Sequence, residues 1–89
     1  MVEAELKIIN KLGLHARAAA KLVATTGAYS SLITLRIGDK SVDGKSIMSV
    51  MMLAAGKGSD IHVRCEGNDE TAALSAIQDL INQRFGEGE

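Results

Sequence analysis

Three segments of this chain alternate between apolar and polar residues, and they limit the fold more than any other feature. In residues 2–8, 32–37 and 60–66, apolar side chains recur at every second position. This period is typical of a β-strand that buries one face and exposes the other. A sheet built from such strands needs cover on one face only. The pattern therefore predicts an open sheet with all its helices on one side.

Three segments have the spacing of helices. An alanine-rich helix is predicted over residues 16–26, and Gly27 follows it in the position where glycine commonly ends a helix. Its predicted buried positions, at three-to-four spacing, are Ala16, Ala19, Ala20 and Val23. A short helix over residues 47–53 has Ser46 as its N-cap.

The last helix is predicted to begin after Asn68 or Asp69 and to end at Gly86. Residues 87–89 are expected to fray. Its buried stripe is predicted to contain Leu74, Ile77, Leu80 and Ile81.

A fourth strand completes the sheet. The Gly38-Asp39 pair predicts a tight turn between residues 32–37 and a short strand over residues 40–43. The resulting order is βαββαβα. We predict a single α+β domain over residues 1–89, an open-faced two-layer sandwich with a four-stranded antiparallel sheet and three helices on one face.

Composition excludes several classes of function. The chain of 89 residues has a formal net charge of −1 with scattered basic residues, which argues against nucleic-acid binding. Tyr29 and Phe85 are its only aromatic residues, so stacking platforms for bases or sugars are missing. No apolar run approaches the ~20 residues that span a membrane. With a single cysteine, Cys65, and no signal-peptide pattern, we expect a cytoplasmic protein.

His15 is the strongest candidate for chemistry. It lies where the loop containing Gly13 becomes the first predicted helix, and Arg17 follows in the first turn. A helix N-terminus offers free N–H groups and a partial positive charge, so the N–H groups of Ala16 and Arg17 favour an anion there. The same dipole disfavours imidazolium and favours neutral imidazole, the nucleophilic form.

The surrounding residues point to a carrier. A purely structural histidine at the helix start is the alternative interpretation. Arg17 opposes the helix dipole, however, which suggests another use for its charge. The motif contains no carboxylate, second histidine or metal cluster to drive difficult chemistry, so we predict neither a metal site nor a cofactor. It could hold a phosphoryl group that one protein loads and another removes.

Two motifs resemble one family over essentially the whole chain. Gly13-Leu14-His15-Ala16-Arg17 resembles the active-site signature of HPr, the histidine-containing phosphocarrier of the bacterial phosphoenolpyruvate:sugar phosphotransferase system. The segment at residues 45–51, Lys-Ser-Ile-Met-Ser-Val-Met, resembles its regulatory segment. The resemblance implies a monomeric carrier, not an enzyme, which receives phosphate on Nδ1 of His15 from enzyme I and passes it to enzyme IIA proteins. In one departure, Ala18 stands where the family usually has proline.

The second motif implies regulation and docking. Ser46 is predicted to cap its helix, and the resemblance adds HPr kinase/phosphorylase as a partner that phosphorylates it. Methionine suits surfaces that bind several partners. Helical spacing places Ile47, Met48 and Met51 on a different arc from Val50 and Leu53. The resemblance assigns a docking patch beside His15 to the first three of these residues.

Two alternatives remain. The chain could act mainly in regulation, as an HPr-type or nitrogen-branch phosphocarrier with little sugar flux. It could also be an unrelated small interaction domain with an incidental histidine. His62, on a polar strand face, is interpreted as solvated, and Cys65 as a small core residue.

Overall fold

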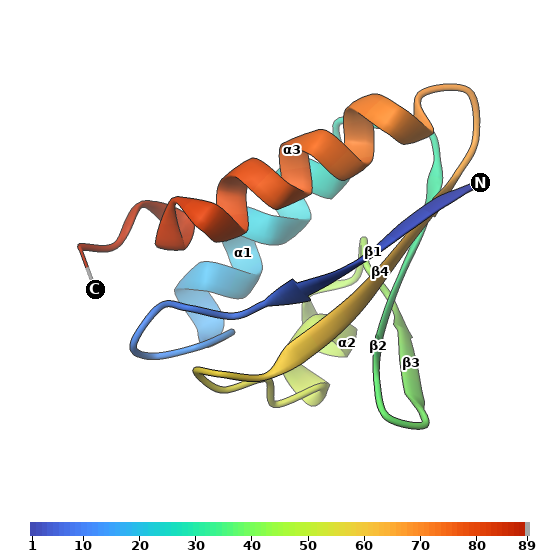
Figure 1. Cartoon of the computed structure of the whole chain (residues 1–89). Coiled ribbons are helices and arrows are strands. Elements are labelled where there is room, and N and C mark those ends of the chain that lie inside the picture. Colours follow the sequence, from blue (N-terminus) through green and yellow to red (C-terminus); the bar gives the residue numbers. More distant parts are fainter. Residues whose placement is uncertain (89) are drawn as a thin grey trace.

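The computed structural model describes residues 1–88, which form one sheet with helices packed against it (Figure 1). The elements are β1 (Val2–Lys7), α1 (Ala16–Thr26), β2 (Leu32–Ile37), β3 (Lys40–Asp43), α2 (Ile47–Met52), β4 (Asp60–Glu66), α3 (Glu70–Asn82) and a 3₁₀ turn, η1 (Arg84–Gly86). The predicted α+β fold is confirmed. None of the helices within residues 1–88 is long and apolar enough to cross a membrane.

The four strands form an antiparallel sheet in the order β1-β4-β2-β3. Along β4 every second side chain is buried, as the alternating pattern predicts: Ile61, Val63 and Cys65 are fully buried. On the opposite face, His62 lies across from Glu5 of β1. The sheet therefore has one apolar and one polar face.

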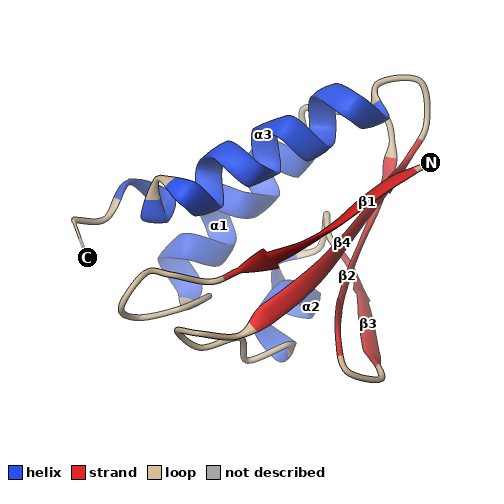
Figure 2. Cartoon of the chain, in the orientation of Figure 1, coloured by secondary structure: helices blue, strands red, loops and turns tan. Residues whose placement is uncertain are grey.

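Helices α1 and α3 lie side by side on the apolar face, and α2 packs against α1 and β3 (Figures 1 and 2). Between these layers lies the apolar core. Its largest fully buried apolar side chains are Phe85, Ile8, Leu22, Leu35, Ile61, Ile77, Val50 and Val63.

The predicted buried face of α1 is partly wrong. Ala16 and Ala20 are exposed, and Val23 is half-buried. The residues of α1 that are buried are Ala18, Ala19, Leu22 and Thr26. This face still has three-to-four spacing, but it is rotated toward the bulkier Leu22. An alanine on either side of the helix has the same small apolar surface, so alanine positions alone poorly define the rotation of the helix.

Two predictions about the last helix also need correction. Helix α3 ends at Asn82 rather than at Gly86, and its fully buried stripe includes Ala73 while Leu74 and Leu80 are only partly buried. After Asn82 the chain forms the separate turn η1, in which Phe85 is 1% exposed. The apolar anchor Phe85 holds the chain against the core beyond the end of α3.

Candidate functional site

The backbone around His15 is held from both sides. Leu14 N–H donates to the Ala55 carbonyl oxygen at 2.8 Å, and Ala19 N–H donates to the His15 carbonyl oxygen at 2.8 Å. Gly13 has a φ of +67°, and a Cβ there would lie 2.5 Å from the Ala55 oxygen. Glycine is therefore required at this close approach. Together these contacts define where the loop ends and α1 begins.

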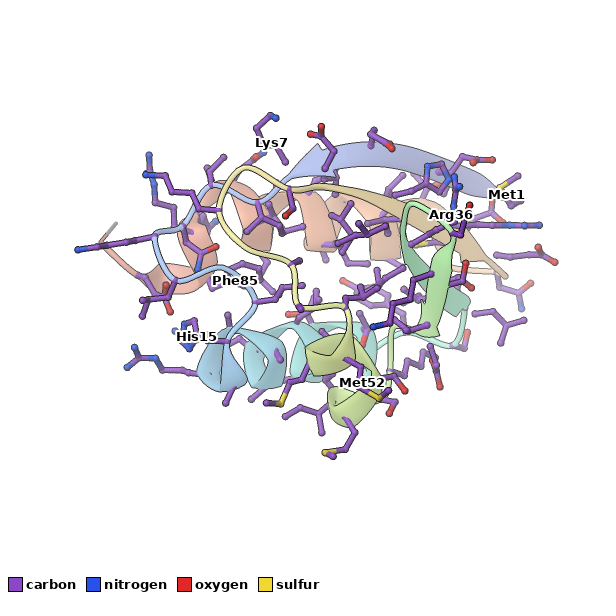
Figure 3. All side chains as sticks on the ribbon, turned by 90° about the horizontal axis from the view of Figure 1, so that it is seen from below. Met1, Lys7, His15, Arg36, Met52 and Phe85 are labelled. Carbon is purple, nitrogen blue, oxygen red and sulfur yellow. The ribbon has the colours of Figure 1, made fainter. Side chains whose placement is uncertain are left out.

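His15 occupies the N-cap position of α1 with an extended backbone, and its side chain makes no capping hydrogen bond. The first N–H groups of a helix have no intrahelical partner, so those of Ala16 and Arg17 remain available to an anion. The Arg17 side chain is 67% exposed and the His15 side chain 24% exposed. Figure 3 shows His15 at the beginning of α1. The predicted cluster of His15, Ala16 and Arg17 thus forms one partly open surface.

A carboxylate from the other end of the chain joins this cluster. One oxygen of Glu87 contacts Nε2 of His15 and lies 3.8 Å from Nε of Arg17. The other oxygen accepts a hydrogen bond from Nδ2 of Asn10 at 2.9 Å. The expectation that residues 87–89 fray is therefore wrong at Glu87, while residue 89 lies outside the described residues. Neither Asn10 nor Glu87 lies within the motif at residues 13–17, so the motif predicts neither of them.

The surroundings of Glu87 favour its charged form. The hydrogen bond from Asn10 and the contact with His15 lower the pKa of the Glu87 carboxyl below its usual value, and the charge of Arg17 adds a smaller effect in the same direction. At neutral pH this carboxylate is ionised and only accepts hydrogen bonds. Within residues 1–88, no group of three or more histidine, cysteine or acidic side chains is placed to hold a metal ion.

The second predicted motif lies on α2. Ser46 is the N-cap, and its hydroxyl accepts a hydrogen bond from Ser49 N–H at 3.3 Å. Val50 and Leu53 face the core, whereas the opposite side of α2 presents an exposed apolar surface. We call this surface the α2 patch: Ile47, Met48, Met51 and Met52, which are 39–69% exposed. The predicted N-cap and the two arcs of α2 are confirmed.

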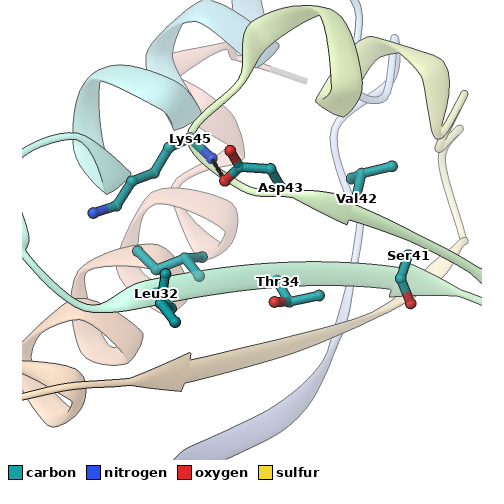
Figure 4. A pocket seen from close by; sticks show the side chains of 7 residues that line it. Leu32, Thr34, Ser41, Val42, Asp43 and Lys45 are labelled. Carbon is teal, nitrogen blue, oxygen red and sulfur yellow. Dashed lines mark hydrogen bonds between the residues drawn. The ribbon is translucent and has the colours of Figure 1, made fainter.

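Two surface hollows differ in their relation to this site. One is lined by Lys11, Leu12, Arg17, Glu87 and Gly88 and so adjoins the His15 cluster. The other lies between β2 and β3, where Asp43 accepts a hydrogen bond from Lys45 N–H at 2.9 Å (Figure 4). Neither His15 nor Ser46 lines this second hollow, and we assign no function to it.

A family model described as the PTS HPr component phosphorylation site matches residues 2–83. The chain is 58% identical over 86 residues to phosphocarrier protein HPr of Pseudomonas aeruginosa, with 96% of each chain covered. It is 49% identical to phosphocarrier protein HPr of Neisseria meningitidis serogroup A over the full length of both.

Solved structures agree with these matches. HPr-C-His from Thermoanaerobacter tengcongensis is similar over 100% of both chains, with a TM-score of 0.97 and 43% identity. HPr from Bacillus anthracis is similar with a TM-score of 0.84 and 37% identity, over 88% of this chain and 93% of that one. From sequence and structure together, the chain belongs to the HPr family of phosphocarriers of the phosphotransferase system.

Proposed function

We propose that His15 accepts a phosphoryl group from phosphorylated enzyme I and passes it to enzyme IIA proteins. The observation that carries this proposal is the position of His15. Its ring lies at the N-terminus of α1, is 24% exposed, and is not used as a helix cap. A partner protein can therefore reach a nucleophilic side chain that lies beside free N–H groups. The chain carries the group as phosphohistidine, and the partner enzymes drive both transfers.

Arg17 and Ala16 are proposed to stabilise the transferred group. Both offer N–H groups at the helix N-terminus, where negative charge is favoured. The guanidinium of Arg17 is exposed and already lies 3.8 Å from a carboxylate oxygen, so it is within reach of a second anion near His15. A charge-assisted hydrogen bond is worth about 1.5–3 kcal/mol, which corresponds to about 10–100-fold in rate. We expect Arg17→Ala to slow transfer by this amount without unfolding the protein.

Labelling from phosphoenolpyruvate tests the assignment. Purified protein is incubated with enzyme I and radiolabelled phosphoenolpyruvate, and the adduct is expected to be acid-labile and base-stable. His15→Ala should abolish labelling, while His62→Ala, which changes the only other histidine, should retain it. Labelling of the His15→Ala variant would refute the proposal. A second incubation with enzyme IIA proteins measures onward transfer.

Regulation at Ser46 is a second proposed function, favoured by its position beside the α2 patch. Phosphorylation would add a charge of about −1.5 to −2 at the N-terminus of α2, which the helix tolerates. The same charge would lie at the edge of an apolar surface formed by Ile47, Met48 and Met51. We propose that this surface docks partner proteins beside His15 and that phosphate on Ser46 weakens docking of acidic partners.

An ATP-dependent HPr kinase/phosphorylase is the proposed enzyme for this modification. Ser46→Ala should lose labelling by the kinase, whereas Ser49→Ala, a serine one turn further along α2, should retain it. Equal labelling of both variants would place the modification elsewhere. Two measurements separate a transport role from a mainly regulatory one. The first is the rate of phosphoryl transfer to enzyme IIA proteins, and the second is the change in that rate when Ser46 is phosphorylated.

We propose that the protein acts as a monomer in the cytoplasm. Its single cysteine, Cys65, is buried among apolar side chains, and burial raises the pKa of its thiol. This suits a core residue and leaves no internal disulfide to require an oxidising compartment. An HPr dimer from Thermoanaerobacter tengcongensis is among the similar structures. Light scattering during size-exclusion chromatography distinguishes the two assemblies, and a dimer mass at micromolar concentration would contradict the proposal.

A further inference from the structure

The Glu87 contact distinguishes the two ring nitrogens of His15. Glu87 is an ionised carboxylate with acceptor oxygens only, and it faces Nε2. The hydrogen bond between them therefore requires a proton on Nε2. In a neutral imidazole the other nitrogen, Nδ1, then carries the free lone pair. The contact thus selects one tautomer of the ring, and that tautomer has its nucleophilic atom on the side away from Glu87.

The chain after α3 holds Glu87 at this position. Phe85 is buried, and its carbonyl oxygen accepts a hydrogen bond from Nζ of Lys21 in α1 at 2.6 Å. Arg84 and Phe85 both have a φ of +55°, and Gly86 has a φ of +77°. Two consecutive non-glycine residues in this left-handed region are uncommon and need support from the surrounding structure. The left-handed turn redirects the chain from α3 toward the start of α1.

Asn10 holds the Glu87 side chain as well. Its amide is fully buried, and Nδ2 donates both to the Gly13 carbonyl oxygen at 2.8 Å and to Glu87 at 2.9 Å. Since both neighbours are acceptors, the amide orientation is determined by its contacts. Asn10 therefore connects the loop before His15 to the carboxylate that contacts the His15 ring.

We propose that Glu87 is a positioning residue for phosphoryl transfer, which keeps the proton on Nε2 of His15 and the lone pair on Nδ1. This inference rests on the proposed role of His15 as the acceptor. In the transfer, the Nδ1 lone pair forms the new bond to phosphorus. The bond from phosphorus to the donor protein's leaving atom breaks, and its electron pair goes to that atom. The proton stays on Nε2, and Glu87 balances the positive charge of the phosphorylated ring.

Nitrogen NMR of the unphosphorylated protein tests the tautomer directly. At a pH at which the ring of wild-type His15 is neutral, we expect a protonated Nε2 and an unprotonated Nδ1, with a slowly exchanging Nε2 proton. Glu87→Ala should lose the slow exchange and shift the ring signals toward the tautomer mixture of a free histidine side chain. His62, whose Nε2 lies 2.6 Å from Glu3, should keep its signals in the same sample and serves as the internal control.

Transfer kinetics supply the second measurement. Mutating the carboxylate partner of a metal-bound histidine typically lowers metal affinity or activity by about 10–100-fold. We expect Glu87→Ala to lower the phosphorylation rate of His15 by a factor of this order. Glu66→Ala, which removes an exposed carboxylate at the far end of β4, should keep the wild-type rate. Glu87→Leu keeps a similar side-chain size and removes both acceptor oxygens, so it replaces Glu87→Ala if that variant does not fold.

The outcomes separate this inference from the proposed function. A wild-type ring protonated on Nδ1 would overturn the role of Glu87, and so would an unchanged ring spectrum and rate in Glu87→Ala. Both results would leave His15 as the acceptor if His15→Ala still fails to be labelled. Labelling of His15→Ala would refute the acceptor assignment itself, whatever the tautomer of the ring.

Discussion

Nδ2 of Asn10 lies 2.9 Å from a carboxylate oxygen of Glu87, although 77 positions separate the two residues in the sequence. The same Nδ2 donates to the Gly13 carbonyl oxygen at 2.8 Å. One buried amide thus connects the loop that carries His15 to the C-terminal segment. The loop and this segment therefore form a single structural unit, although each belongs to a different end of the chain.

Replacing Asn10 with alanine should weaken this unit. The buried Gly13 carbonyl oxygen would lose its donor, which typically costs about 1–3 kcal/mol of unfolding free energy. Glu87 would also lose the partner that contributes most to lowering the pKa of its carboxyl. Urea denaturation measures the first effect. Asn68→Ala, at an exposed position before α3, should change stability by less than about 0.5 kcal/mol; equal losses in the two variants would contradict the proposed connection.

Gly13 should tolerate substitution poorly because two constraints meet there. Its φ of +67° disfavours an L-residue, and a Cβ would lie 2.5 Å from the Ala55 carbonyl oxygen. We expect Gly13→Ala to cost about 2–4 kcal/mol, from backbone strain together with the steric clash. Gly38→Ala is the matched control, since Gly38 has a φ of +58° but no atom within 4 Å of the added Cβ.

Gly38→Ala should therefore lower the free energy of unfolding by about 1 kcal/mol, because it introduces backbone strain at a positive φ but no steric clash. Thermal or urea unfolding of both variants gives the difference, which isolates the clash with the Ala55 carbonyl oxygen. If the two substitutions were equally destabilising, the close approach of the loop to Ala55 would not matter for folding.

The two faces of α2 should respond differently to truncation. Leu53 is 6% exposed and belongs to the core, so Leu53→Ala should cost about 2–5 kcal/mol. Met48 is 69% exposed, and Met48→Ala should change stability by less than about 0.5 kcal/mol. If the α2 patch docks partners, only Met48→Ala should weaken binding to enzyme I without loss of stability, as measured by calorimetric titration. Unchanged binding would remove Met48 from the docking surface.

The sequence predicts the strands well because their signal is local. In β4 the apolar residues Ile61, Val63 and Cys65 are separated by polar ones, so the period itself identifies the buried face. The alanine-rich helix α1 lacks such contrast. Ala16 and Ala18 have the same side chain, yet the first is exposed and the second fully buried. Packing of the whole helix against the sheet decides between them, and no local pattern contains that information.

The candidate site is predicted only in part, for a related reason. His15 and Arg17 are adjacent in the sequence and share a helix start, so their motif identifies them. Glu87 reaches His15 through a left-handed turn at Arg84 and Phe85, a conformation that these residue types rarely adopt. In the sequence, the large apolar side chain of Phe85 is a sign that the chain stays packed near residue 85. The direction in which it continues depends on tertiary contacts with Lys21 and Asn10.

Asp69 connects the start of β2 to the start of α3, and it differs from its predicted role. It occupies the N-cap position of α3, but its side chain makes no capping hydrogen bond. Its carboxylate instead accepts hydrogen bonds from the backbone N–H groups of Ser30 at 2.8 Å and Ser31 at 3.0 Å, and from both hydroxyls. Together these bonds lower the pKa of Asp69 to about 2. The hydrogen bond from the Ser31 hydroxyl contributes most to this shift, followed by the one from the Ser30 backbone N–H.

Because the pKa of Asp69 is lower in the folded state than its usual value of 3.8, its ionised form stabilises the fold above that value. The contribution is lost as the pH falls from about 4 through about 2, where the carboxylate becomes protonated in the folded protein. Asp69→Asn should therefore unfold at lower urea concentration than the wild type at pH 7, and the difference should shrink across this interval. Asp79→Asn, at an exposed position on α3, should show no such change. A difference between Asp69→Asn and the wild type that stays constant down to pH 2 would mean that the ionised carboxylate does not provide this stabilisation.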